Sequence, residues 1–164
     1  MLSRMVTQTG PLLFMLFLLY ACTTLSADIS TVKDGPVQIL GTLNGDLPVS
    51  SLKMLPVELQ EQPVGYLSSQ KQLDVFLQSI QADGTLLPVV DFSSQIILFA
   101  KNTVYYNRLS IGQVFREGET LTILAMETRS AMPVTDKVAI SLVIIERNGA
   151  MFIDAGNTKV TIEN

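Results

Sequence analysis

The segment "DKVAISLVIIE", residues 136–146, is apolar at nearly every position. A strand with one solvated face alternates apolar and polar side chains, whereas a continuous apolar run of this length is typical of a strand buried on both faces. The segment therefore predicts a central strand of a sheet, and the remaining elements must supply the layers that cover it.

Further strand-like segments lie on both sides of this run. "QIILFAK" (residues 95–101) predicts a second buried strand, and β-branched and aromatic residues fill the segment that follows it. In "TLTILAMETR" (120–129), apolar and polar positions alternate at first, and "REGE" (116–119) predicts a hairpin turn before it. Asn148-Gly149 and Gly156-Asn157 predict turns into two last strands, "AMFID" and "TKVTI".

One amphipathic helix is predicted over residues 70–81. Leu73, Phe76, Leu77 and Ile80 recur at the spacing of one helical face. Ser69 and Gln72 have the spacing of a capping box, and Asp83-Gly84 closes the segment. The sequence therefore predicts an α+β domain that is predominantly antiparallel β, either a sandwich or a partly open barrel, with a single core.

Residues 37–59 lie before the helix and have no clear period. Their short apolar pieces are interrupted by Gly41, Asn44-Gly45, Pro48 and Pro56. Asn-Gly is a strong turn signal. This part of the chain therefore predicts short edge strands or an irregular wrap.

The N-terminal segment "LLFMLFLLYACTT" (Leu12–Thr24) is too short to cross a bilayer, which takes about 20 apolar residues. It has the pattern of an export signal, with cleavage either after Ala27 or before Cys22. Leu19-Tyr20-Ala21-Cys22 resembles the bacterial lipobox. That resemblance implies a signal peptide over 1–21, palmitate-type acylation of Cys22 and a lipid anchor in the membrane, with the outer membrane favoured because position 23 is not Asp.

Composition restricts the function further. With residues 1–21 removed, 164 − 21 = 143 residues remain, enough for one domain over 37–164 behind a flexible tether over 22–36. They carry 10 basic and 15 acidic side chains, a net charge of −5, which argues against nucleic acid as a partner. Without histidine, and with the only cysteine acylated, we expect no metal and no cofactor.

Catalysis is also not expected. Ser68-Ser69-Gln70-Lys71 has the S-x-x-K spacing of penicillin-recognising enzymes, but the companion S-D-N and K-T-G motifs are absent. A helix cap explains the same residues, and a structural hydrogen bond explains Asp91 between Val90 and Phe92. A small hydrolase that uses carboxylates or a Ser-Lys pair stays as one alternative function, and a structural envelope lipoprotein stays as another.

The succession "LPVVDFSSQIILFA" (87–100), "LSIGQVFREGETLTILAMET" (109–128) and "DKVAISLVII" (136–145) resembles the PrcB C-terminal-type domain of exported bacterial proteins. Asp91-Phe92 match that family well. The segment before the hairpin has Tyr105 and Tyr106 without the family's glycines, and Pro133 is a partial match. Over residues 87–162, the resemblance implies a non-enzymatic β-domain that stabilises or binds another protein.

We therefore expect a lipid-anchored, non-enzymatic accessory or binding domain in a bacterial cell envelope, facing the periplasm or the exterior. We expect a partner to bind through the long hairpin over 105–129 or through its flanking edge, because projecting hairpins and strand edges recruit other chains. The expected partner-binding residues are Tyr105, Tyr106, Arg116 and Glu117. One of the two tyrosines should face outward.

Overall fold

The computed structural model describes residues 34–55, 57–82, 87–102, 107–129 and 135–163. All of them lie within one compact unit, residues 32–164. Cys22, Tyr105, Tyr106 and Asp83-Gly84 lie outside the described residues.

The strands are β1 (Gly35–Pro36), β2 (Ile39–Pro48), β3 (Val64–Leu67), β4 (Gln81–Ala82), β5 (Gln95–Asn102), β6 (Asn107–Glu117), β7 (Thr120–Arg129), β8 (Lys137–Glu146), β9 (Phe152–Asp154) and β10 (Lys159–Thr161). The helical elements are the 3₁₀ helix η1 (Val49–Met54) and the helices α1 (Val57–Glu61) and α2 (Gln70–Ser79). The sequence did not indicate η1, α1 or the short strands β1, β3 and β4.

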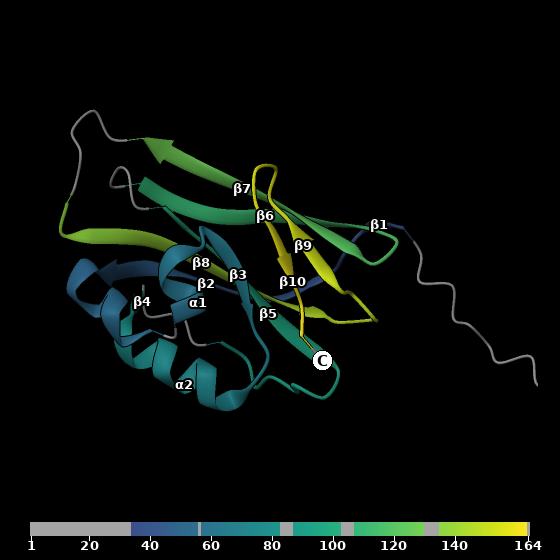
Figure 1. The fold of residues 1–164 in the computed structure, drawn as a ribbon, viewed down its shortest axis with the longest axis horizontal. Helices are drawn as coiled ribbons and strands as arrows, with labels where there is room; N and C mark the ends of the chain where they lie inside the picture. Colours follow the sequence, from purple (N-terminus) through teal and green to yellow (C-terminus); the bar gives the residue numbers. More distant parts are fainter. Residues whose placement is uncertain (1–33, 56, 83–86, 103–106, 130–134, 164) are drawn as a thin grey trace, which may run out of the picture. The chain divides into compact units, whose positions relative to one another are not determined.

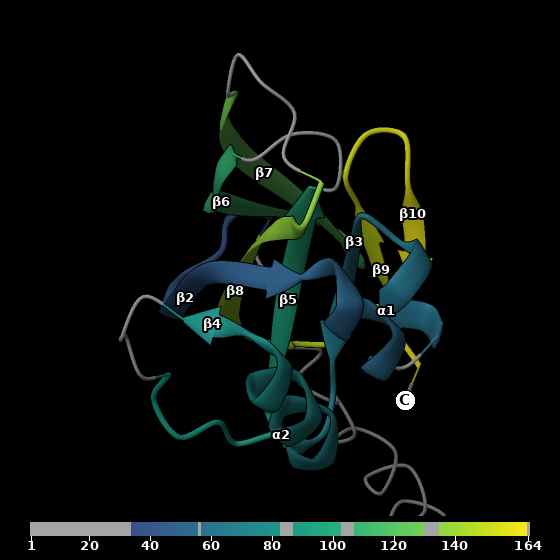
Figure 2. The same ribbon diagram turned by 90° about the vertical axis from the view of Figure 1, so that its left-hand side faces the viewer.

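The strands form two sheets, which face each other with the helices beyond one of them (Figures 1 and 2). The central sheet has the order β3-β5-β8-β2-β4, and the hairpin sheet has the order β1-β6-β7-β9-β10. Every pairing is antiparallel except that of β7 with β9. The expected α+β, predominantly antiparallel fold is confirmed, and its form is a sandwich.

Strand β8 occupies the middle of the central sheet, as its apolar run predicts. It pairs with β5 on one side and with β2 on the other, and residues 138–145 are buried without interruption. Strand β5 is likewise buried over 96–101, so the prediction of a second buried strand is confirmed. Because their side chains alternate between two covered faces, these two strands contribute to two separate apolar layers.

The first apolar layer fills the space between the sheets and includes Ile96, Leu98, Ile123, Val143, Ile145 and Ile153. The second covers the opposite face of the central sheet, under α2 and η1, and includes Leu43, Leu73, Phe76, Ile97, Phe99, Leu142 and Ile144. The expectation of a single core is therefore wrong. A sheet covered on both faces has one core layer on each face.

Ser141 is the only polar side chain within residues 138–145, and it is fully buried. Its hydroxyl accepts a hydrogen bond from the backbone N–H of Ile111 at 2.9 Å and donates to Asn44 Oδ1 at 2.7 Å. Strand β6 bulges at Gly112, next to Ile111, so the regular ladder is interrupted there. The hydroxyl thus joins the two sheets at the bulge.

Residues 39–48 form neither the short edge strands nor the irregular wrap that the sequence indicated. They form the ten-residue strand β2, which lies between β8 and β4 in the central sheet. Asn44-Gly45 makes no turn: both residues pair with β8 in the middle of the strand. The local turn preference is overridden by the pairing and by the bond from Ser141 to Asn44.

Helix α2 confirms the predicted helix, with three corrections. Ser69 is the N-cap and accepts from the backbone N–H of Gln72, whose Oε1 accepts from the Ser68 backbone N–H at 2.8 Å. Leu73 and Phe76 are buried as expected, but Leu77 is 38% exposed. The helix ends at Ser79, two residues early, so Ile80 lies beyond it in an extended conformation.

The domain begins earlier than the sequence suggested. Gly35 and Pro36 pair with Arg116 and Phe115 of β6, and Asp34 Oδ1 accepts from the Gly118 backbone N–H at 2.7 Å. Asp34, Gly35 and Pro36, which were expected to belong to a tether over 22–36, are therefore part of the domain. Among the described residues, no helix has the length and apolar character needed to cross a membrane.

The second apolar layer makes a stability prediction. Replacing Phe76 with Ala should lower the free energy of unfolding by about 3–5 kcal/mol, because its fully buried ring also packs against Phe99, with ring centroids 6.3 Å apart. Leu77→Ala, one residue away on the same helix, should cost less than about 1 kcal/mol. Reversible urea denaturation measures both, and equal losses would contradict this account of the helix.

Candidate functional site

Strand β7 has an edge that only part of the domain covers. On one side it pairs with β6 along its length, and on the other it pairs with β9 only at residues 120–122. Beyond Thr122, residues 123–126 have no strand partner on that side among the described residues. Their backbone groups on that side are available for pairing with another strand.

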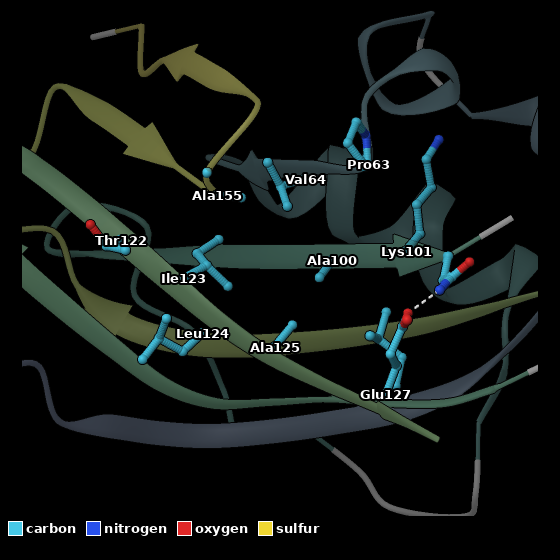
Figure 3. A pocket seen from close by; sticks show the side chains of 13 residues that line it. Pro63, Val64, Ala100, Lys101, Thr122, Ile123, Leu124, Ala125, Glu127 and Ala155 are labelled. Atoms are coloured by element: carbon cyan, nitrogen blue, oxygen red, sulfur yellow. Dashed lines mark hydrogen bonds between the residues drawn. The ribbon is translucent and has the colours of Figure 1, made fainter. Parts of the chain in front are cut away.

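An open cleft of about 610 Å³ lies along this edge (Figure 3). It is lined by Pro63, Val64, Ala100, Lys101, Asn102, Leu109, Thr122, Ile123, Leu124, Ala125, Glu127, Ala155 and Gly156. Successive side chains of a strand point to opposite faces. Because four consecutive residues of β7, 122–125, line the cleft, it must follow the edge of the strand as well as one face.

The walls of the cleft are mostly apolar. Val64 and Ala100 belong to the central sheet, Leu109 and Ile123 belong to the hairpin sheet, and all four are buried. Ala125 lies on the same face of β7 as Ile123, yet it is exposed. The sandwich is therefore open on this side, beyond the point where β9 ends.

Lys101 places a buried cation beside the cleft. Its side chain is 6% exposed, and its ammonium group donates to the backbone carbonyls of Leu59 and Gln60 in α1. Burial lowers the pKa of Lys101 below its usual value. Lysine favours the carboxyl end of a helix, so this residue ties α1 to β5.

A polar contact joins the two sheets beside the cleft. Asn102, at the end of β5, donates from Nδ2 to the carboxylate of Glu127 on β7 (Figure 3). Both residues line the cleft. The apolar walls thus meet a hydrogen-bonded, acidic group near the end of β7.

The hairpin tip differs from the expected contact surface. Arg116 is only 5% exposed: its guanidinium donates to the carbonyls of Arg147 at 2.6 Å and Asn148 at 2.7 Å. The bulge at Gly112 shifts the alternation of β6 so that Arg116 faces inward. Arg116, expected to bind a partner, is therefore buried, whereas Glu117 is exposed at the turn.

The residues with possible catalytic roles are in structural positions. Ser68 forms hydrogen bonds with Gln72, and Ser69 caps α2. Lys71 is exposed on the first turn of α2 and makes no hydrogen bond with Ser68. The Asp91 carboxylate accepts from Ser93 and Ser94, as predicted for a structural residue. The hydrogen bonds from Ser93, and then the one from Ser94, lower the pKa of Asp91.

Within the described ranges, no three acidic, cysteine or histidine side chains gather into a group that could hold a metal ion. Comparisons with protein-family models, curated proteins and solved structures found no match to this chain.

The sequence did not single out the cleft. Two signals were present: a lysine inside the apolar run "QIILFAK", and four successive apolar residues, "ILAM" (123–126), in a strand that otherwise alternates. The first marks a cation that needs carbonyl partners when buried. The second marks a place where both faces of a strand are apolar.

Lys101→Met should lower the free energy of unfolding by about 1–3 kcal/mol at neutral pH, because one buried and one partly buried carbonyl lose their donor. The pH dependence has a definite sign. Because the folded-state pKa of Lys101 is depressed, the unfolded state binds more protons between that pKa and the ordinary value of 10.5. The wild-type domain should gain stability relative to Lys101→Met as the pH rises through that window. Denaturation at several alkaline pH values measures this difference, and a constant or falling difference would contradict it.

Proposed function

We propose that this chain is a lipid-anchored, non-enzymatic protein of a bacterial cell envelope whose β-domain binds another protein. One observation carries the proposal: an apolar cleft and a strand edge without a partner among the described residues meet on the open side of the sandwich. Apolar walls bind apolar side chains, and a strand edge binds an extended backbone. Together they suit a polypeptide.

The chemistry of the chain supports contact over catalysis. Histidine, the commonest general base, does not occur in the sequence. The cleft offers one cation, Lys101, whose ammonium is already bonded to two carbonyls, and one carboxylate, Glu127, bonded to Asn102. Neither arrangement resembles a nucleophile with its base.

The anchor is supported by the sequence of the N-terminal segment. Leu19-Tyr20-Ala21-Cys22 resembles a lipobox and follows an apolar run too short to span a bilayer. Between Cys22 and Asp34, the first described residue, the chain could extend at most about 40 Å. The resemblance to a protease-complex accessory domain points to the same class of function, a protein that acts by binding.

Lipidation makes a direct prediction. Cys22→Ala should abolish incorporation of a palmitate analogue in growing cells, because the thiol is the acceptor of the diacylglyceryl group. Thr24→Ala, two residues away, should keep full labelling. Equal labelling of wild type and Cys22→Ala would contradict the anchor.

The binding function is tested by purification. The full chain, extracted with mild detergent from its native membranes, should retain one envelope protein in a constant ratio through two successive columns. Recovery of the chain alone, or of many proteins in varying ratios, would count against a specific partner.

A further inference from the structure

We propose that the partner contributes an extended segment that adds as a strand to residues 123–126 of β7 and places alternate apolar side chains in the cleft. This inference rests on the proposed function and names its site. It concerns the β7 edge and not the hairpin tip, where Arg116 is buried.

The fold already uses this edge once. Strand β9 pairs in parallel with residues 120–122 of β7 and ends at Asp154, and the chain then turns away at Gly156, which has φ 82°. The strand position that β9 occupies beside β7 therefore extends along residues 123–126, and Ala155 and Gly156 lie at the end of this position nearest to β9. A segment of about four residues, roughly 13 Å long, would continue the sheet there.

The two faces of such a strand would meet different surroundings. Side chains on the inner face would enter the cleft against Val64, Ala100 and Ile123. Those on the outer face would lie beside Leu124 and Met126, which are 47% and 66% exposed. The fitting segment therefore has aliphatic residues at the inner positions and β-branched residues, such as valine or threonine, at the outer positions.

Charge favours a basic segment. Residues 34–164 contain nine Lys and Arg and fourteen Asp and Glu, a net charge of −5. Glu127 lies at the far end of the cleft from Ala155. Lysine or arginine flanking the apolar core of the segment would be attracted to the net negative charge of the whole domain.

A second copy of the chain fits the site less well. Each copy would bring the same net charge of −5, and this repulsion opposes the pairing of two identical edges.

The test uses the full chain in detergent micelles and a fluorescein-labelled peptide, Lys-Val-Thr-Val-Thr-Val-Lys, with blocked ends. We expect saturable binding by fluorescence anisotropy, and at least tenfold weaker binding of the same residues with the valines grouped together. Strand addition uses the N–H groups of alternate residues. Two further peptides are therefore compared, one methylated at the backbone nitrogens of the valines and one at those of the threonines. One of the two should bind at least tenfold more weakly, and the other should keep its affinity.

Two matched variants locate the site. Ala125→Trp fills the cleft from an exposed position and should weaken peptide binding at least tenfold. Gln113→Trp adds the same side chain at an exposed position of β6 and lines no part of the cleft, so it should leave the affinity unchanged. Equal melting temperatures of the two variants are the check on folding, and Ala125→Leu replaces the tryptophan variant if it melts early.

Absent binding, equal effects of the two methylated peptides, or equal affinities of the two tryptophan variants would each overturn the inference. A chain that elutes as a dimer, with dimerisation lost in Ala125→Trp, would also overturn it, since the edge would then be occupied by a second copy. The proposed function is tested separately: an envelope partner that still co-purifies with Ala125→Trp would keep the binding function and remove this site.

Discussion

Strand β8 is apolar on both faces, so the domain must supply two covers for it. The hairpin sheet covers one face and the helical layer covers the other. The hydroxyl of Ser141, which this arrangement buries in the layer between the sheets, needs hydrogen-bond partners there. It finds them in the Ile111 backbone and the Asn44 side chain, which sets β6 and β2 in position against β8.

The parts of the fold that could be predicted from sequence have local causes. The apolar run of β8, the cap of α2 at Ser69 and the Asn148-Gly149 turn each follow from neighbouring residues. Strand β2 could not be predicted, because its Asn44-Gly45 pair has a strong turn preference by itself. Only pairing with residues distant in the sequence makes it a strand.

The candidate site was less predictable than the fold. A single extra residue, Gly112, reverses which side chains of β6 face inward, and this moves Arg116 from the expected surface into the interior. The cleft exists because β9 is short and leaves the rest of the β7 edge uncovered. Strand length and bulge position depend on tertiary packing, which a pattern of residue types does not record.

Strand β1 determines how the domain would bear a mechanical load. A pull on the chain before residue 34 reaches β1 first, and β1 is held by two residue pairs with β6 and by the bond between Asp34 and Gly118. Neither Gly35 nor Pro36 belongs to an apolar layer. Detaching them would release roughly 10 Å of chain and leave both layers intact. The first strand would thus act as a short extension near the hairpin tip, beside the residues of β6 that pair with Leu121 and Thr122 of β7.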